Sequence, residues 1–488
     1  MSARPLPSSP PSAQGVDATG VLAFLDAVEA AEAIEPHGLM ILRHGRVVAA
    51  GWWEPYTSDR LHLLYSLSKS FTSTAVGMAV AEGLIGLDDP VLSYFPELDA
   101  DITDPRSRAM LVRHVAAMAS GHREETYDRA HALDPDDLVR GFLLLPPDRD
   151  PGTVFAYNQP ATFALAAIVR RVTGESLTSY LRPRLLDPLG IGEIAWLTDR
   201  SGRELGFSGL HATTDAIARL GQLYLDGGVW EGERLLSEEW VAEATRAHTA
   251  TAAPATAEAD RTDWERGYGF QFWRSRHGYR GDGAYGQFCV VLPEQDAVLA
   301  MTAATNDMQA VLSLAWEHLL PAFRPRPAAG REDADAALAR RLAHLALPPA
   351  PGAPAPPGRG DVWSGAGFTP RGGVCADQPG LTRAVVTEGT DGWTLTLVEQ
   401  PGDRRLELPL GSDGRRTGEG SPPTAVGGGW TDAGTLAVHI VFLETPHRLR
   451  VTCSLADGTF TARWDTTPLH GGPLRSLRAP RRTARSGG

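Results

Sequence analysis

Ser66 and Lys69 are the two residues of this sequence whose types and spacing are best suited to nucleophilic chemistry. Residues three apart on a helix share one face, so the hydroxyl and the amine would be neighbours. Lys69 is also the only lysine, because all the others among the 46 lysines and arginines are arginine. Arginine keeps its proton, whereas a desolvated lysine can lose it and act as a base. We therefore predict that Lys69 activates Ser66 as a nucleophile.

The residues around this pair predict a buried helix. From Ser66 to Val80 the side chains are apolar or small on almost every side, and Gly83 is a natural end. Burial disfavours the charged form of a lysine and lowers its pKa by up to ~3–5 units. A serine in the first turn would also lie at the positive end of the helix dipole, beside free backbone N–H groups. Ser-x-x-Lys occurs by chance in many sequences, but the single lysine and the apolar helix favour a catalytic pair.

The composition limits the classes of function. A chain of 488 residues is long enough for two or three domains. Its net charge of −13 argues against binding to nucleic acid or to an anionic membrane surface, because both need basic patches. No apolar run reaches the ~18 residues that suggest a membrane span. Cys289, Cys375 and Cys453 have the spacing of neither a disulfide framework nor a metal site. We therefore expect a cytoplasmic protein without metal or cofactor.

Helices and short strands around the Ser66 helix form a pattern typical of an α/β (α+β) fold. Helices are predicted at 16–33, 160–174, 211–226, 237–246 and 307–320, a hairpin at 38–49, and strands at 268–273, 285–292 and 297–302. Strands joined by tight links favour an antiparallel sheet packed by helices. Tyr157 precedes the helix that begins at Pro160, a place where a side chain can point into a cleft.

Changes in composition divide the chain into five parts. The Ser/Pro-rich residues 1–14 lack a basic start and an apolar stretch, so we expect a flexible leader rather than a secretory signal. A catalytic domain at 15–323 precedes a Pro/Ala-rich linker at 324–360, with one short helix at 333–345. Residues 361–474 alternate strand-like runs with Gly/Asp turns and predict a small all-β domain. The arginine-rich residues 475–488 predict a disordered tail rather than nucleic-acid binding.

The motifs of the predicted catalytic domain occur in a characteristic order. Ser66 and Lys69 form Ser-x-x-Lys after an amino-terminal helix and a hairpin. Tyr157 opens a second motif with Gln159 in its third place, and Thr173-Gly174-Glu175-Ser176 follows. This series resembles the serine hydrolases of the penicillin-binding protein and class C β-lactamase superfamily, whose second motif is Tyr-x-Asn or Tyr-x-Ser. The resemblance implies an antiparallel sheet flanked by helices, an all-helical lobe, and a cleft that the longer Gln159 side chain would reshape.

The third motif of that family, Lys-Thr-Gly or a His-containing equivalent, has the weakest match. We align it with Ala284-Tyr285-Gly286-Gln287, because Gly-Gln at the start of a strand is similar to non-lactamase relatives. Gly286 and Gln287 would then border the cleft, and no cation would stand where β-lactamases bind the carboxylate of a penicillin. Arg280 is nearby in the sequence. The all-β domain resembles the lipocalin-like appendage of some relatives.

The resemblance implies two-step acyl transfer on small ester or amide substrates. Lys69 would take the Ser66 proton, and Ser66 would attack the carbonyl carbon. The N–H groups of Ser66 and Gln287 would hold the oxyanion, and Tyr157 would give a proton to the leaving group. Water would then release the acid.

Other functions remain open on the sequence alone. The same residues could transfer the acyl group to an amine, as in peptide cyclisation, or hydrolyse D-amino-acid amides. A penicillin-binding-like protein could also bind a ligand without catalysis, and a cell-wall DD-peptidase would need export. His122 could be proposed as a base, but a histidine after a Ser-Gly helix stop is more often structural.

Overall fold

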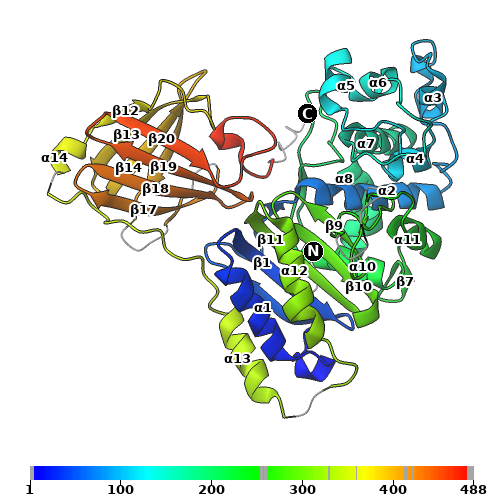
Figure 1. The fold of residues 1–488 in the computed structure, drawn as a ribbon, viewed down its shortest axis with the longest axis horizontal. Coiled ribbons are helices and arrows are strands. Elements are labelled where there is room, and N and C mark those ends of the chain that lie inside the picture. The colour runs from blue at the N-terminus through cyan, green and yellow to red at the C-terminus, as the bar shows by residue number, and fades with distance from the viewer. Residues whose placement is uncertain are drawn as a thin grey trace, which may run out of the picture.

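The predicted catalytic domain is built on a six-stranded antiparallel sheet (Figure 1). The computed structural model describes residues 5–252, 257, 261–327, 330–358, 360–411, 416–418 and 422–480. The strand order is β2-β1-β11-β10-β9-β8. The strands span Ile34–Arg43 (β1), Arg46–Trp52 (β2), Trp273–Arg274 (β8), Tyr279–Gly283 (β9), Gln287–Leu292 (β10) and Ala297–Thr305 (β11). The expected fold class is confirmed, although β9 was not predicted because its Gly-Asp-Gly sequence is typical of a loop.

Helices cover both faces of this sheet. Strand β10 is buried at every position, so Phe288 and Val290 pack on one face and Cys289 and Val291 on the other. The first face is covered by α1 (Ala18–Ala30), α12 (Met308–Leu314) and α13 (Glu332–Leu342). The second face is covered by α10 (Thr214–Leu225), with α2 (Ser68–Ala81) beside it. The continuously apolar strands therefore lie at the centre of a three-layer domain.

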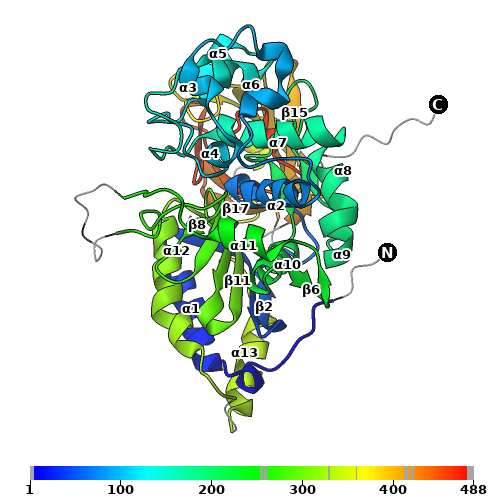
Figure 2. The ribbon, with the colours of Figure 1, turned by 90° about the vertical axis from the view of Figure 1, so that its right-hand side faces the viewer.

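A helical lobe lies on the far side of α2 from the sheet (Figure 2). It contains α3 (Pro105–Arg108), α4 (Val112–Ala116), α5 (Tyr127–Leu133), α6 (Leu138–Leu144) and α7 (Gln159–Thr173). Helix α7 ends at Gly174, whose φ of 74° is left-handed and suits glycine. The remaining short elements are α8 (Leu177–Leu181), α9 (Asp187–Leu189), α11 (Glu238–Thr245), β3 (His62–Leu63), β4 (Ala195–Trp196), β5 (Leu210–Ala212), β6 (Val229–Trp230) and β7 (Glu233–Arg234).

The carboxy-terminal part forms a separate nine-stranded sheet, so the predicted all-β domain is confirmed. Helix α14 (Gly360–Trp363) precedes it, and the strand order is β15-β14-β13-β12-β20-β19-β18-β17-β16. The strands span Gly367–Pro370 (β12), Leu381–Gly389 (β13), Gly392–Glu399 (β14), Arg404–Pro409 (β15), Arg416–Gly418 (β16), Thr424–Asp432 (β17), Thr435–Phe442 (β18), His447–Ser454 (β19) and Thr459–Trp464 (β20). Trp363, Trp393 and Trp430 pack in its core.

Three segments that the composition predicts to be free are instead packed against the rest of the protein in their described residues. Residues 5–14 pair with β2, since the Val47 N–H donates to the Pro7 carbonyl (2.8 Å). The expected flexible leader is therefore wrong for these residues, and residues 1–4 lie outside the described range. The predicted linker helix is α13, and its apolar side chains pack on α1 and β2, which makes the segment part of the domain. Residues 475–480 also pack, through an Ala479 N–H bond to Glu444 (2.7 Å), and the rest of the predicted tail lies outside the described residues.

The docking of α13 predicts a measurable loss of stability on truncation. Leu338 is 1% exposed, so Leu338→Ala should lower the free energy of unfolding of the catalytic domain by about 2–5 kcal/mol. Leu133→Ala, at a side chain that is 50% exposed, should change it by less than about 0.5 kcal/mol. Urea unfolding followed by tryptophan fluorescence would measure both. Equal effects would show that α13 is a spacer rather than part of the core.

Candidate active site

Ser66 lies in a tight turn between the segment that pairs with strand β5 and the start of helix α2. The turn is the 3-10 helix η2 (Tyr65–Leu67), one turn before α2, rather than the first turn of α2 itself as the sequence predicts. Leu64 pairs with β5 through its N–H and the Leu210 carbonyl (2.8 Å). Tyr65 has a left-handed φ of 46°, which is uncommon for a large side chain. Ser66 is partly exposed, whereas its neighbours on both sides are buried.

The Lys69 amine is 1% exposed and lies among three oxygen atoms. Its Nζ is 3.1 Å from Ser66 Oγ, 2.6 Å from Gln159 Oε1 and 2.8 Å from the Phe207 carbonyl oxygen. The Gln159 and Phe207 oxygens can only accept hydrogen bonds, and a neutral amine has two N–H bonds and one lone pair. When Lys69 is neutral, its two N–H bonds point to these two oxygens, and its lone pair faces the Ser66 hydroxyl. This arrangement would allow Lys69 to accept a proton from the Ser66 hydroxyl.

Burial favours the neutral form of the Lys69 amine. Desolvation lowers the pKa of Lys69 to about 7, and the nearby carboxylates of Asp282 and Glu125 oppose this shift. An amine with the ordinary pKa of 10.5 would be neutral in about one molecule in three thousand at pH 7. The environment therefore places the titration of Lys69 near neutral pH.

Tyr157 forms a wall of the same site, just before α7. Its ring centroid lies 4.7 Å from Lys69 Nζ, and the ring stacks on Trp273 at 5.3 Å. Burial raises the pKa of Tyr157 well above its ordinary value, and Asp282 acts in the same direction, while a hydrogen bond with Ser66 opposes them. The phenol therefore keeps its proton at neutral pH and can donate it.

Gln159 is brought to the site as predicted, and its contact explains why a glutamine fits there. As the first residue of α7, it reaches across to accept the 2.6 Å hydrogen bond from Lys69. Asn158 points the other way, since its Oδ1 accepts hydrogen bonds from Thr126 N–H and Oγ1 at 3.2 and 2.8 Å. The sequence order Tyr-Asn-Gln therefore places the second and third side chains on different sides of the chain.

The segment aligned with the third motif lies mainly behind the edge of the cleft. Gln287 is buried in β10, and its Nε2 donates to the carbonyls of Ala284 (3.1 Å) and Ala303 (2.8 Å). The strand nearer to the nucleophile is β9. A Cβ atom at Gly283 would lie 1.9 Å from the Leu64 carbonyl oxygen, so only glycine permits this close approach. The side chain of Gln287 is thus not part of the cleft, and β9 ends beside Ser66.

Asp282 is the site residue that the sequence gave no reason to select. It is 6% exposed, and its Oδ2 accepts a hydrogen bond from Arg280 Nε at 2.9 Å. Burial raises the pKa of Asp282, and Arg280 opposes this shift. Arg280 itself is fully buried, with Nη1 donating to the carbonyls of Asp263 and Arg274 and to Ser275 Oγ. The Arg280 guanidinium therefore makes its hydrogen bonds inside the protein and does not replace the missing cation of the third motif.

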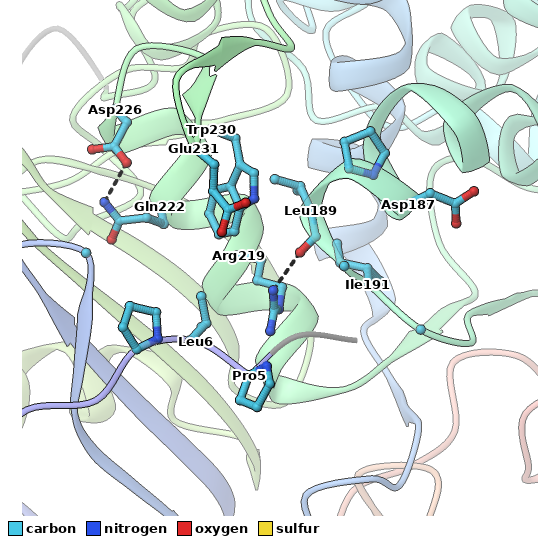
Figure 3. Close-up of a pocket in the computed structure, with 15 residues that line it drawn as sticks. Pro5, Leu6, Asp187, Leu189, Ile191, Arg219, Gln222, Asp226, Trp230 and Glu231 are labelled. Atoms are coloured by element: carbon cyan, nitrogen blue, oxygen red, sulfur yellow. Dashed lines mark hydrogen bonds between the residues drawn. The ribbon is translucent and has the colours of Figure 1, made fainter. Parts of the chain in front are cut away.

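Neither His122 nor the pocket around Arg219 forms a second catalytic site. His122 is buried between Ser120 Oγ (3.0 Å) and the Leu145 carbonyl (3.1 Å), which is a structural arrangement. A pocket of about 500 Å³ between the amino-terminal segment and α10 contains Arg219, which donates to the Leu189 carbonyl (Figure 3). Ser66, Lys69 and Tyr157 do not line this pocket. In the described ranges, no cluster of metal-ligating side chains occurs, and no helix is long and apolar enough to cross a bilayer.

Comparison with known proteins agrees with this geometry. Residues 25–323 match the Beta-lactamase family. The sequence is 30% identical to the 6-aminohexanoate-dimer hydrolase of Paenarthrobacter ureafaciens over 286 residues, 55% of this chain and 72% of that enzyme. It is 27% identical to Esterase EstB of Burkholderia gladioli over 217 residues, 38% of this chain and 55% of that enzyme.

Solved structures show the same fold. A putative 6-aminohexanoate-dimer hydrolase from Bacillus anthracis superposes with a TM-score of 0.52 and 20% identity, over 65% of this chain and 87% of that one. The fold, the site and these relatives define a serine hydrolase. The chain belongs to the Beta-lactamase family, and the expected family is confirmed.

The environment of Lys69 predicts a specific pH dependence. Activity should rise with pH through a midpoint of about 7, because the base must lose its proton. Gln159→Glu should move this midpoint upward, since a carboxylate beside Nζ favours the charged amine. Lys69→Arg and Lys69→Ala should each lower kcat/KM by at least about 100-fold, because neither supplies a base at this position.

The control for this prediction is Gln159→Met, which is of similar length and adds no charge. A pH profile of ester hydrolysis for each variant would make the measurement. Retention of most activity by Lys69→Arg, or an unchanged midpoint in Gln159→Glu, would show that Lys69 is not the base.

Proposed function

We propose that the chain hydrolyses small esters and amides through an acyl-enzyme on Ser66, with Lys69 as base. The observation that carries the proposal is the position of the buried Lys69 Nζ, which lies within hydrogen-bond distance of Ser66 Oγ and of two carbonyl oxygens that can take up the N–H bonds of the neutral amine. Lys69 takes the hydroxyl proton as Ser66 Oγ bonds to the substrate carbonyl carbon. The carbonyl then re-forms, and the bond to the alcohol or amine breaks.

Tyr157 is the proposed proton donor to the leaving group. Its raised pKa keeps the phenol protonated, and it is in contact with both Ser66 and Lys69. The proton that Lys69 received can replace the one that Tyr157 gives away, so the site returns to its starting charge. Water then attacks the acyl-enzyme and Lys69 accepts a proton from it. As the bond between the acyl carbon and Ser66 Oγ breaks, Lys69 returns this proton to Oγ, and the acid product leaves.

For the oxyanion, we infer donors at the end of β9 rather than at Gln287. The approach of Gly283 to the Leu64 carbonyl places the β9–β10 turn beside the nucleophile. The main-chain N–H groups of Ser66 and Ala284 are then the proposed pair of donors, which is the usual solution for a tetrahedral intermediate. Gly286 lies in this turn, and Gln287, the first residue of β10, supports it by donating from Nε2 to the Ala284 carbonyl.

Charge at the site supports neutral or amine-bearing substrates. Asp282 and Glu125 are the two carboxylates close enough to act on Lys69, and Arg280 is occupied by Asp282. A substrate with its own carboxylate, such as a penicillin, would meet the Glu125 carboxylate, and the nearby Arg280 is already paired with Asp282. Similarity to a 6-aminohexanoate-dimer hydrolase and to esterases supports amides and esters as the substrate class. A cytoplasmic location is also proposed, and the three buried, unpaired cysteines support a reducing compartment.

Ser66→Ala should abolish turnover and leave the fold intact. The loss should be at least about 10³-fold, because the nucleophile is removed. Ser93→Ala is the matched control, since Ser93 also lies in a 3-10 helix (η3, Val91–Tyr94) and is exposed. A fluorophosphonate probe followed by mass spectrometry should label Ser66 in the wild-type chain and in Ser93→Ala. Wild-type activity in Ser66→Ala would refute the serine mechanism.

The Glu125 carboxylate and the pairing of Arg280 with Asp282 predict a substrate preference. The kcat/KM for a short-chain p-nitrophenyl ester should exceed that for nitrocefin, because nitrocefin carries a carboxylate. A neutral anilide of a short acid serves as the amide comparison. Nitrocefin turnover that matches the ester rate would contradict the proposed substrate class while leaving the role of Ser66 intact.

A further inference from the structure

One segment of the all-β domain reaches the catalytic site. Residues 465–470, which follow β20, contact three loops of the catalytic domain. His470 Nε2 lies 2.8 Å from Ser208 Oγ, next to the Phe207 carbonyl that accepts the Lys69 hydrogen bond. Tyr285 lies in the turn that follows β9, and its hydroxyl donates a hydrogen bond to the Thr467 carbonyl. The same segment thus touches the surroundings of the base and of the proposed oxyanion site.

The contact with Tyr65 is the closest to the nucleophile. Its hydroxyl lies 2.6 Å from His447 Nε2 and accepts the Leu469 N–H at 3.2 Å. Its ring stacks on His470, with 5.7 Å between centroids, and meets Tyr285 edge-on at 5.6 Å. Tyr65 is 2% exposed, so a residue that adjoins Ser66 in the sequence is enclosed largely by groups of another domain.

The partners of His447 show which hydrogen bond the Tyr65 hydroxyl donates and which it accepts. His447 Nδ1 lies 2.8 Å from the Thr466 carbonyl oxygen, which can only accept, so the proton is on Nδ1. Burial lowers the pKa of His447 to about 3, so the ring is neutral and Nε2 carries a lone pair. The Tyr65 hydroxyl therefore donates to His447 and accepts from Leu469. Both of its hydrogen-bonding roles are met by the all-β domain.

We propose that Tyr65 is a positioning residue through which the all-β domain holds Ser66 in its reactive geometry. Tyr65 has the left-handed φ of 46° that sets the direction of the turn at Ser66, and the surrounding structure must maintain this conformation. His447 and the 467–470 segment supply that restraint from outside the family's catalytic domain. The inference rests on the proposed role of Ser66 as nucleophile. It assigns to the all-β domain a part in catalysis itself.

The test is Tyr65→Phe in the full chain, which removes the hydroxyl and keeps the ring. We expect the rate constant for fluorophosphonate labelling of Ser66, and kcat for a short-chain ester, to fall about 10- to 100-fold. KM should stay within about twofold, because the hydroxyl does not touch substrate. Tyr94→Phe is the matched control, since the Tyr94 hydroxyl also accepts an N–H (Gly86, 2.9 Å) and donates once (Asp89, 2.7 Å). It should label at the wild-type rate.

Variants on the other domain test the same link. His447→Leu removes the acceptor and should reproduce the loss, whereas His447→Gln can keep an acceptor near Nε2 and should retain most of the labelling rate. Thermal unfolding checks that each variant is folded. Wild-type labelling rates in both Tyr65→Phe and His447→Leu would overturn the inference. Failure of the probe to label Ser66 in the wild-type chain would instead overturn the proposed function, so the two failures are distinguishable.

Discussion

The removal of the Lys69 amine from water is the constraint on which the rest of the site depends. A buried amine is stable only if its hydrogen bonds are met, and here two carbonyl oxygens and one hydroxyl surround it. The helical lobe supplies Gln159, the segment before β5 supplies Phe207, and η2 supplies Ser66. Three separate parts of the fold must therefore meet for a single lysine to act as a base.

The carboxylates near Lys69 limit how far its pKa falls. Desolvation alone favours the neutral amine, while Asp282 and Glu125 favour the charged one, and the balance is a pKa of about 7. Asp282 is itself tied to Arg280 in the interior of the sheet edge. Both residues are on β9, and Arg280 also donates to the carbonyls of Asp263 and Arg274, so the electrostatics of the site and the packing of β9 are not independent.

The two-domain arrangement places a further condition on the nucleophile. Tyr65 belongs to the catalytic domain by sequence, but its hydroxyl is bound by His447 and Leu469 of the all-β domain. The predicted linker is likewise not free, because its helix α13 packs on α1 and on strand β2 of the sheet. A composition rich in Pro and Ala describes the flexibility of an isolated segment, but it does not show which apolar side chains find a partner.

The sequence by itself determined that Ser66 and Lys69, the proposed nucleophile and base, are neighbours, because they lie three residues apart and their proximity is local. It also identified Tyr157 and Gln159, whose motif lies at the start of a helix with clear signals. Only the tertiary structure decided three other contacts. These are the hydrogen bond of Lys69 to the Phe207 carbonyl, the position of β9 beside Ser66, and the hydrogen bond between His447 and the Tyr65 hydroxyl. These contacts join residues separated by 138 and 382 positions for Phe207 and His447, and no periodicity or spacing records which distant segments will meet. Strand β9 shows the same limit, because its glycines are typical of a loop in sequence, whereas in the structure the Leu64 carbonyl packs so closely that Gly283 must be a glycine.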